Sequence, residues 1–148
     1  MKNYSSFKQT SAALNNAETT CLAIVENYLA TISENNAEIN AFVEVFTEEA
    51  LEKAKIIDRK ITEGKSGKLA GMVIGIKDNI CYKNHKVSAS SKILSDFESL
   101  YSATVIEKLE KEDVIIIGRL NCDEFAMGSA NENSIYGAVK NPHNINKV

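Results

Sequence analysis

The chain has 148 residues, of which 44% are hydrophobic and 25% are charged, which is typical of a soluble globular domain or part of one. Its net charge of −3 and its pI of about 5.5 give no basic footprint for nucleic acid. No segment approaches the roughly 18 consecutive apolar residues of a membrane span, and residues 1–13 lack the apolar core of a signal peptide.

The first half of the chain, residues 1–64, is predicted to be mainly helical. The apolar residues of a first helix recur at steps of three and four, as one buried helix face requires: Leu22, Val25, Leu29 and Ile32. Asn16 is expected to cap this helix, and Asn35 and Asn36 to end it. A short strand follows at residues 41–45. Thr47 is expected to cap a second helix, whose inner face is Ala50, Ala54, Ile57 and Ile61 and which Gly64 stops.

Residues 69–148 are predicted to begin an α/β core. Residues 72–76 and 114–117 are short apolar runs rich in β-branched side chains, which is typical of buried strands. Ser102 is expected to cap an amphipathic helix between these strands, and residues 81–98 are expected to form an irregular loop. A strand, a helix and a second strand predict a right-handed crossover within a parallel sheet.

Two loops are expected to meet at one edge of this sheet. Lys77 ends the first strand, and residues 121–134 follow the second. In open α/β sheets, ligands bind at the carboxyl ends of the strands, so residues 77–79 and 121–134 should line one crevice. A lysine buried there loses its proton more easily than a surface lysine and can act as a base. The alternative is a solvated Lys77 in a weak surface ion pair with Asp78.

The other chemically active side chains form no convincing nucleophilic site. Ser129 lacks a G-x-S-x-G setting and has no histidine placed to activate it. Asp123 and Glu124 are adjacent, so they should diverge and accept structural hydrogen bonds. His85 and His143 lie in polar loops without a partner at ligand spacing, and both are expected to be solvated.

The cysteines support neither a metal site nor a disulfide framework. Cys21, Cys81 and Cys122 are odd in number, are widely spaced and include no C-x-x-C pair. We therefore expect three free thiols.

Several ordered motifs resemble the amidase signature family. Residues 69–80, LAGMVIGIKDNI, resemble the segment around the catalytic lysine of that family. Residues 121–129, NCDEFAMGS, with ENS at 132–134 and NP at 141–142, resemble one branch of it, the A subunits of glutamyl-tRNA(Gln) amidotransferases. The resemblance covers nearly the whole chain from about residue 17 onward.

The resemblance implies an amidase-signature fold: an α/β structure whose mixed, largely parallel sheet is flanked by helices. Residues 1–148 would be the amino-terminal part of a single amidase domain, with the sheet still incomplete. Proteins of the family use a Ser–cis-Ser–Lys triad, in which the lysine takes a proton from the cis-serine, which in turn activates the nucleophilic serine. Lys77 matches that lysine, and the matching part of the substrate pocket is Met127, Gly128 and Ser129.

Both triad serines of the family lie in a Gly/Ser-rich segment shortly after the Asn-Pro motif. This chain ends at residues 146–148, where that segment would begin. We therefore expect an amino-terminal fragment that holds the base but lacks both serines, and that releases no ammonia from glutamine by itself.

For this branch, the resemblance implies hydrolysis of glutamine to supply ammonia for converting Glu-tRNA(Gln) to Gln-tRNA(Gln) in the cytoplasm. The implied partners are subunits B and C in a heterotrimer. The chain is expected to hold no cofactor or metal, because ATP and Mg²⁺ are used by a partner subunit. One alternative is a stand-alone amidase acting on a small amide. The other is a non-catalytic binding or scaffold domain with the same fold.

Overall fold

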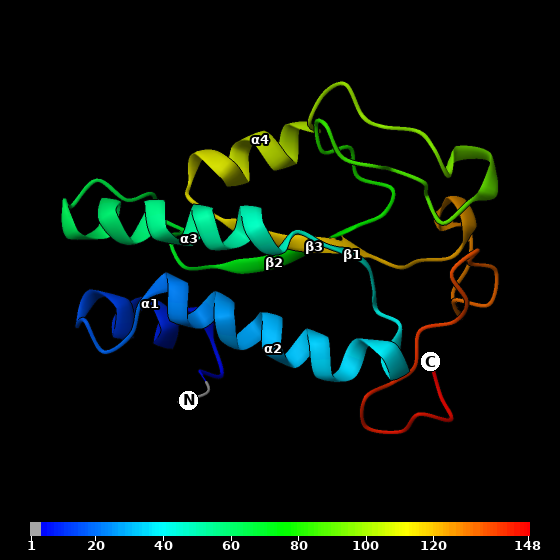
Figure 1. Cartoon of the computed structure of the whole chain (residues 1–148), viewed down its shortest axis with the longest axis horizontal. Coiled ribbons are helices and arrows are strands. Elements are labelled where there is room, and N and C mark those ends of the chain that lie inside the picture. Colours follow the sequence, from blue (N-terminus) through cyan, green and yellow to red (C-terminus); the bar gives the residue numbers. More distant parts are fainter. Residues whose placement is uncertain (1–3) are drawn as a thin grey trace.

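A computed structural model describes residues 4–148 as an α/β structure (Figure 1). Its helices and strands, in chain order, are α1 (Phe7–Asn15), α2 (Cys21–Ile39), β1 (Phe42–Val45), α3 (Thr47–Thr62), β2 (Val73–Lys77), α4 (Thr104–Lys111) and β3 (Ile115–Leu120). Short 3₁₀ turns occur at Lys92–Leu94 and Glu124–Ala126. Within residues 4–148, no helix is both long and apolar enough to cross a membrane.

The three strands form one mixed sheet in the order β1-β3-β2. Strand β2 pairs with β3 in parallel, with Val73 opposite Ile115 and Lys77 opposite Leu120. Strand β1 pairs with the other edge of β3 in the antiparallel direction. The predicted strands at residues 72–76 and 114–117 are therefore neighbours in one sheet, as expected, and the loop after β2 returns through α4 to β3.

Alternate residues of β3 face two separate cores. Ile115 and Ile117 pack with buried residues of α1, α2 and α3, whereas Ile116 packs with Ile106 of α4 and Ile76 of β2. Figure 1 shows α2 and α4 on opposite sides of the sheet. Both faces of β3 are therefore covered, which explains why its sequence is a continuous apolar run rather than an alternating one.

The beginning of the first predicted helix is wrong. Asn16 is the carboxyl-terminal cap of α1, a separate helix that the sequence analysis did not predict. Helix α2 begins after Thr20, whose hydroxyl accepts a hydrogen bond from the Ala23 N–H at 3.1 Å. Threonine is also a favoured residue at this position, because its hydroxyl satisfies a free N–H of the first turn.

The predicted end of that helix at Asn35 and Asn36 is also wrong, because α2 continues to Ile39 and is capped by Asn40 at φ +59°. The Asn36 side chain exchanges two 2.8 Å hydrogen bonds with the backbone of Phe42. Asn36 thus connects α2 to β1 from within the helix instead of ending it.

Two further predicted caps are wrong, although the helices themselves are present. Thr47 is the first residue of α3, and the buried Phe46 before it makes no side-chain cap. Ala103 precedes α4, and the Ser102 hydroxyl accepts instead from the Lys83 N–H at 3.2 Å. The predicted inner face of α3 is confirmed: Ala50, Ala54 and Ile57 are buried and Ile61 packs against them.

Candidate active site

Lys77 lies at the edge of a crevice formed where β2 and β3 end. The N–H of the next residue, Asp78, donates to the Leu120 carbonyl at 2.9 Å, so the two chain segments leave the sheet together. Figure 1 shows the segment after β2 and the segment after β3 at the same end of the sheet. The crevice has a volume of about 390 Å³ and is lined by Lys77, Asn121, Cys122, Asp123, Ala126, Gly128, Ser129, Ala130, Asn131, Val139 and Val148. The predicted convergence is therefore confirmed for Lys77 and for residues between 121 and 131, whereas Asp78, Asn79 and residues 132–134 do not line the crevice.

The Lys77 side chain is exposed, so the expectation of a buried lysine is wrong and the solvated alternative is correct for this side chain. Asp78 does not form the surface ion pair of that alternative, because its carboxylate is buried and pairs with Arg119. Asp78 is fully buried, and its carboxylate accepts from the Ser88 N–H at 3.0 Å, the Ser90 N–H at 2.7 Å and the Ser88 hydroxyl. The same carboxylate pairs with Arg119 of β3. The ion pair made by Asp78 is thus inside the protein, and neither of its two residues lines the crevice.

Arg119 occupies the position of β3 beside Ile76 of β2 and is itself buried. Its Nη1 contacts Asp78, while its Nε and Nη2 donate to the Glu44 carboxylate of β1 at 3.2 and 3.1 Å. Burial alone would lower the pKa of Arg119, but the hydrogen bond and the charge of Asp78 outweigh it and raise the pKa. The Arg119 guanidinium therefore stays charged and neutralises the buried Asp78 carboxylate.

The segment around Ser90 joins Asp78 to the far wall of the crevice. The Ser90 hydroxyl accepts from the Cys122 N–H at 3.2 Å, and the Ala89 carbonyl accepts from the Phe125 N–H at 2.8 Å. Ala89 and Ser90 both have left-handed backbones, at φ +48° and +50°. Such residues cost about 1–3 kcal/mol each and persist only where their surroundings hold them. The hydrogen bonds to Asp78 and Cys122 supply that restraint.

Of the predicted pocket residues, Gly128 and Ser129 line the crevice, whereas Met127 does not and is 82% exposed. Gly128 lies so close to Asp123 that a Cβ at position 128 would be 2.3 Å from its carboxyl carbon. The Asp123 carboxylate accepts from the Asn131 N–H at 2.9 Å. Asp123 therefore organises this wall of the crevice, as the prediction of a structural role required.

Glu124 also has a structural role, because its carboxylate accepts a hydrogen bond from the Ser91 hydroxyl at 2.6 Å.

The structural role of Asn121 was missed by the sequence analysis. Its Oδ1 accepts from the Ser134 hydroxyl at 2.6 Å and its Nδ2 donates to the Gly137 carbonyl at 2.9 Å. Nothing in the local sequence distinguishes Asn121 from an ordinary loop asparagine.

Two other missed features did leave a signal in the sequence. Arg119 is a charged residue within an apolar strand, and a buried charge requires a partner. Residues 88–91 are a run of small residues, which allows the close backbone approach to Asp78 that the structure shows.

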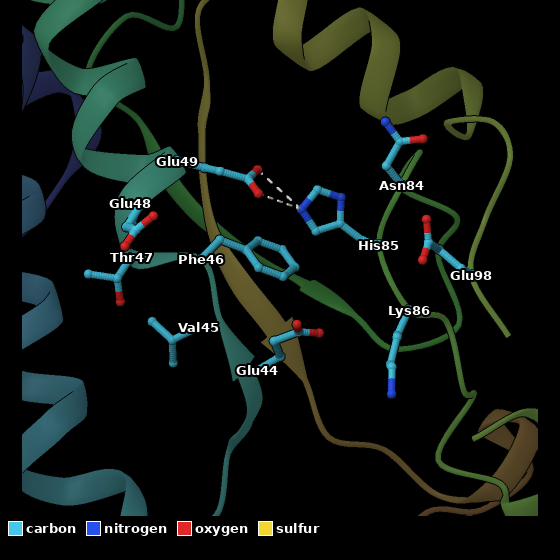
Figure 2. A pocket seen from close by; sticks show the side chains of 10 residues that line it. All are labelled: Glu44, Val45, Phe46, Thr47, Glu48, Glu49, Asn84, His85, Lys86 and Glu98. Atoms are coloured by element: carbon cyan, nitrogen blue, oxygen red, sulfur yellow. Dashed lines mark hydrogen bonds and ion pairs between the residues drawn. The ribbon is translucent and has the colours of Figure 1, made fainter. Parts of the chain in front are cut away.

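The prediction that His85 is solvated is wrong. Its ring stacks on Tyr82 with centroids 4.1 Å apart, lies 4.4 Å from the Phe46 ring, and its Nε2 is 3.1 Å from the Glu49 carboxylate. Figure 2 shows the contact between His85 and Glu49. It lies in a second hollow, of about 540 Å³, which is bordered by the start of α3 and by residues 84–86. That hollow shares no lining residue with the crevice. His143 is exposed, as expected.

All three cysteines are free thiols, as predicted. Burial is the main reason that the pKa of the Cys21 thiol is raised far above its ordinary value, which makes it a poor nucleophile. Among residues 4–148, no group of three or more His, Cys, Asp and Glu side chains is arranged to hold a metal ion.

Comparison with known proteins identifies the family to which the chain belongs. The sequence model of the Amidase family matches residues 23–148. The chain belongs to the amidase family.

Two amidase relatives carry the same name. In Salinibacter ruber, the A subunit of glutamyl-tRNA(Gln) amidotransferase is 47% identical over 140 residues, which are 95% of this chain and 27% of that protein. The crystal structure of the corresponding protein of Thermotoga maritima is 28% identical, with a TM-score of 0.67 over 84% of this chain and 25% of that one. This amidase chain thus spans about a quarter of the length of these relatives.

Another solved amidase-fold structure superposes more closely. It is the inhibitor-bound form of a vestigial protein complex that reveals the evolutionary origins of an s-triazine catabolic enzyme. Its identity is 29% and its TM-score is 0.89, over 95% of this chain and 31% of that one. The fold is therefore shared with solved proteins that bear different names.

Proposed function

We propose that this amidase chain is part of the glutamine-hydrolysing A subunit of a tRNA-dependent amidotransferase. The observation that carries the proposal is the 47% identity, over 95% of the chain, to the A subunit of a glutamyl-tRNA(Gln) amidotransferase. The reaction would release ammonia from glutamine and use it to convert Glu-tRNA(Gln) to Gln-tRNA(Gln).

Lys77 is proposed as the general base. It ends β2 at the edge of the crevice, where its amine can reach a ligand, and its neighbour Asp78 is turned into the protein. An amine must be neutral to accept a proton, and exclusion of water from a closed site favours the neutral form. In the family mechanism, Lys77 would take the proton of the cis-serine hydroxyl, and that serine would take the proton of the nucleophilic serine.

Gly128 and Ser129 are proposed to contact the substrate. Both line the same crevice as Lys77, and Gly128 has no side chain of its own, which allows the Asp123 carboxyl group to lie directly against its backbone. Met127 is included in the proposed pocket, although its side chain lies outside the crevice in residues 4–148.

The proposed partners are subunits B and C, in a heterotrimer that works in the cytoplasm. ATP and Mg²⁺ are assigned to the partner that activates the glutamyl group on the tRNA. Copurification of the full-length protein with two smaller subunits would separate this proposal from a stand-alone amidase.

The proposal is tested with Lys77→Ala and Lys77→Arg in the full-length protein assembled with its partners. Both variants should lose glutamine hydrolysis by at least about 100-fold, because a guanidinium cannot act as a base near neutral pH. Formation of Gln-tRNA(Gln) from added free ammonia should stay near the wild-type rate, since that step belongs to the partner. A Lys77→Arg variant that keeps most of its glutaminase rate would show that Lys77 is a positioning charge and not the base.

A further inference from the structure

Asp78, the residue that follows Lys77, forms a buried ion pair with Arg119 of β3. Along the end of β2, burial alternates: Ile76 is buried, Lys77 is exposed and Asp78 is fully buried. Strand β2 ends at Lys77, and Asp78 is the first residue of the turn that follows. The chain therefore exposes the Lys77 side chain at the crevice and buries the Asp78 carboxylate in the protein.

The pair connects every segment that shapes the Lys77 edge of the crevice. Asp78 accepts hydrogen bonds from Ser88 and Ser90, and Ser90 in turn accepts from the Cys122 N–H in the crevice wall. Arg119 comes from the neighbouring strand and holds the other side of the same carboxylate. A displacement of Asp78 would therefore move the backbone of Lys77 and the opposite wall together.

We propose that Asp78 and Arg119 are a positioning pair for Lys77, which fixes the backbone beside the amine and offsets two of the charges that lie near it. This inference rests on the proposed role of Lys77 as the base. Neither residue contacts the crevice itself, because neither is among its lining residues.

Few charged groups face this region. The charged side chains of the crevice lining and of the adjoining network are Lys77, Asp78, Arg119, Glu44 of β1, and Asp123 after β3. Two further titratable groups are the Tyr136 hydroxyl, which is 2.9 Å from the Ser88 hydroxyl and interacts with Arg119, and the Cys122 thiol of the crevice lining. Glu44 contacts Arg119, and the Asp123 carboxylate accepts backbone N–H groups at the far wall. Removing one member of the Asp78–Arg119 pair therefore changes the net charge next to Lys77 by one unit of known sign, positive for Asp78→Asn and negative for Arg119→Gln.

The test compares Asp78→Asn with Arg119→Gln in the full-length protein assembled with its partners, by the pH dependence of kcat/KM for glutamine hydrolysis. The acid limb of that profile reports the base of the free enzyme. Asp78→Asn removes one negative charge and leaves Arg119 paired with Glu44 alone, which favours the neutral amine relative to wild type, so the acid limb should move to lower pH. Arg119→Gln removes the positive charge shared by Asp78 and Glu44, which favours the ammonium, so the limb should move to higher pH. Each shift should be roughly 0.5–1 pH unit.

Displacement of the Lys77 backbone should also lower kcat by roughly 100-fold in both variants, with KM changed by less than about threefold. The ammonia-dependent step should be unaffected. A loss that was only structural would lower the amount of folded protein and would leave the acid limb of the remaining activity in place.

Asp113→Asn is the matched control. Asp113 is another buried carboxylate beside β3, at the opposite end of the strand, where it accepts from Lys60 at 2.6 Å and from the Gly67 N–H at 2.8 Å. Its variant should lose thermal stability and keep both the kcat and the pH profile of the wild type.

If a single variant does not fold, Asp78→Asn combined with Arg119→Gln removes both charges and keeps the wild-type net charge, and Arg119→Lys keeps the positive charge but loses the planar fork. Both should fold, keep the wild-type acid limb and lose kcat. The positioning role would be overturned if the acid limbs of the two single variants moved in the same direction. It would also be overturned if kcat stayed within threefold of wild type in both the double variant and Arg119→Lys. A wild-type protein without Lys77-dependent glutaminase would instead overturn the proposed function.

Discussion

At the scale of single residues, the protein separates an exposed lysine from the carboxylate that follows it in sequence. Lys77 remains available at the crevice because Asp78 is satisfied elsewhere, by two backbone N–H groups, a hydroxyl and Arg119. A carboxylate in direct contact with the amine would favour the ammonium and oppose a role as a base. The contacts of Asp78 thus help to decide whether Lys77 can act as a base.

A second buried carboxylate, Asp113, gives a prediction about stability and pH. Burial would raise its pKa, but hydrogen bonds from Lys60 and from the Gly67 N–H outweigh burial and lower the pKa below its ordinary value. The resulting stabilisation is present above the unfolded-state pKa of about 3.9 and is lost as the pH falls through the lower folded-state pKa.

Asp113→Asn should therefore cost about 1–3 kcal/mol at pH 7, as expected for losing charge-assisted hydrogen bonds at a buried site. The backbone of residue 113 is left-handed, at φ +63°, and asparagine tolerates this conformation. Urea unfolding of the full-length protein measures the effect. A difference from wild type that is as large near pH 2 as at pH 7 would contradict the electrostatic explanation.

At the scale of elements, β1 and β3 can pair only because β3 contains a glycine where the two strands approach closely. Gly118 is opposite Val45, and the register of the pair shifts between Phe42 and Glu44. A Cβ at position 118 would lie 2.4 Å from the Glu44 carbonyl oxygen and 2.9 Å from the Phe42 ring. Backbone cannot yield as a flexible side chain can, so the two strands would separate locally.

Gly118→Ala should consequently destabilise the protein by about 3 kcal/mol or more, at the upper end of overpacking effects. Gly64→Ala is the control, because Gly64 has φ +66° but has no atom within 4 Å of its potential Cβ. The control should cost only about 1 kcal/mol of backbone strain. Thermal unfolding of both variants in the full-length protein measures the difference, and equal losses would show that the close approach is not limiting.

At the scale of the whole structure, residues 4–148 form two cores that share the central strand. Strand β3 pairs on both edges and is buried on both faces, whereas the crevice is formed from irregular segments at one end of the sheet. This arrangement holds the site residues on loops that a rigid sheet positions.

The arrangement predicts the order of amide hydrogen exchange in the full-length protein. The N–H groups of β3 should exchange slowest, because opening them requires separation of both neighbouring strands. In residues 128–134, most N–H groups should exchange fast, and those of Asn131 and Asn133 should be protected by the Asp123 carboxylate. Hydrogen exchange of peptides from these segments, followed by mass spectrometry, measures these rates. Slower exchange in β1 or β2 than in β3 would contradict the assignment of β3 as the most stable element.

Local patterns were sufficient for the strands, the helical inner faces and the position of Lys77. Apolar runs and three-to-four-residue spacing reflect which side of an element is buried, and a short window of sequence contains that information. The same reasoning placed Lys77 and the segment after β3 at one edge of the sheet, and the crevice confirms that placement. The roles of Lys77, Met127, Gly128 and Ser129 in a reaction stay predictions.

The partners of polar side chains were decided only by the tertiary structure. Asp78 and Arg119 are 41 positions apart, and Arg119 and Glu44 are 75 apart. Ser102 has a hydroxyl that suits a helix cap, yet it accepts from Lys83, and His85 has its ring between aromatic side chains rather than in water. A hydrogen bond requires two groups at a set distance and angle, and the fold alone brings distant groups to that geometry. Burial follows from local pattern, whereas pairing follows from the meeting of segments that are far apart in the chain.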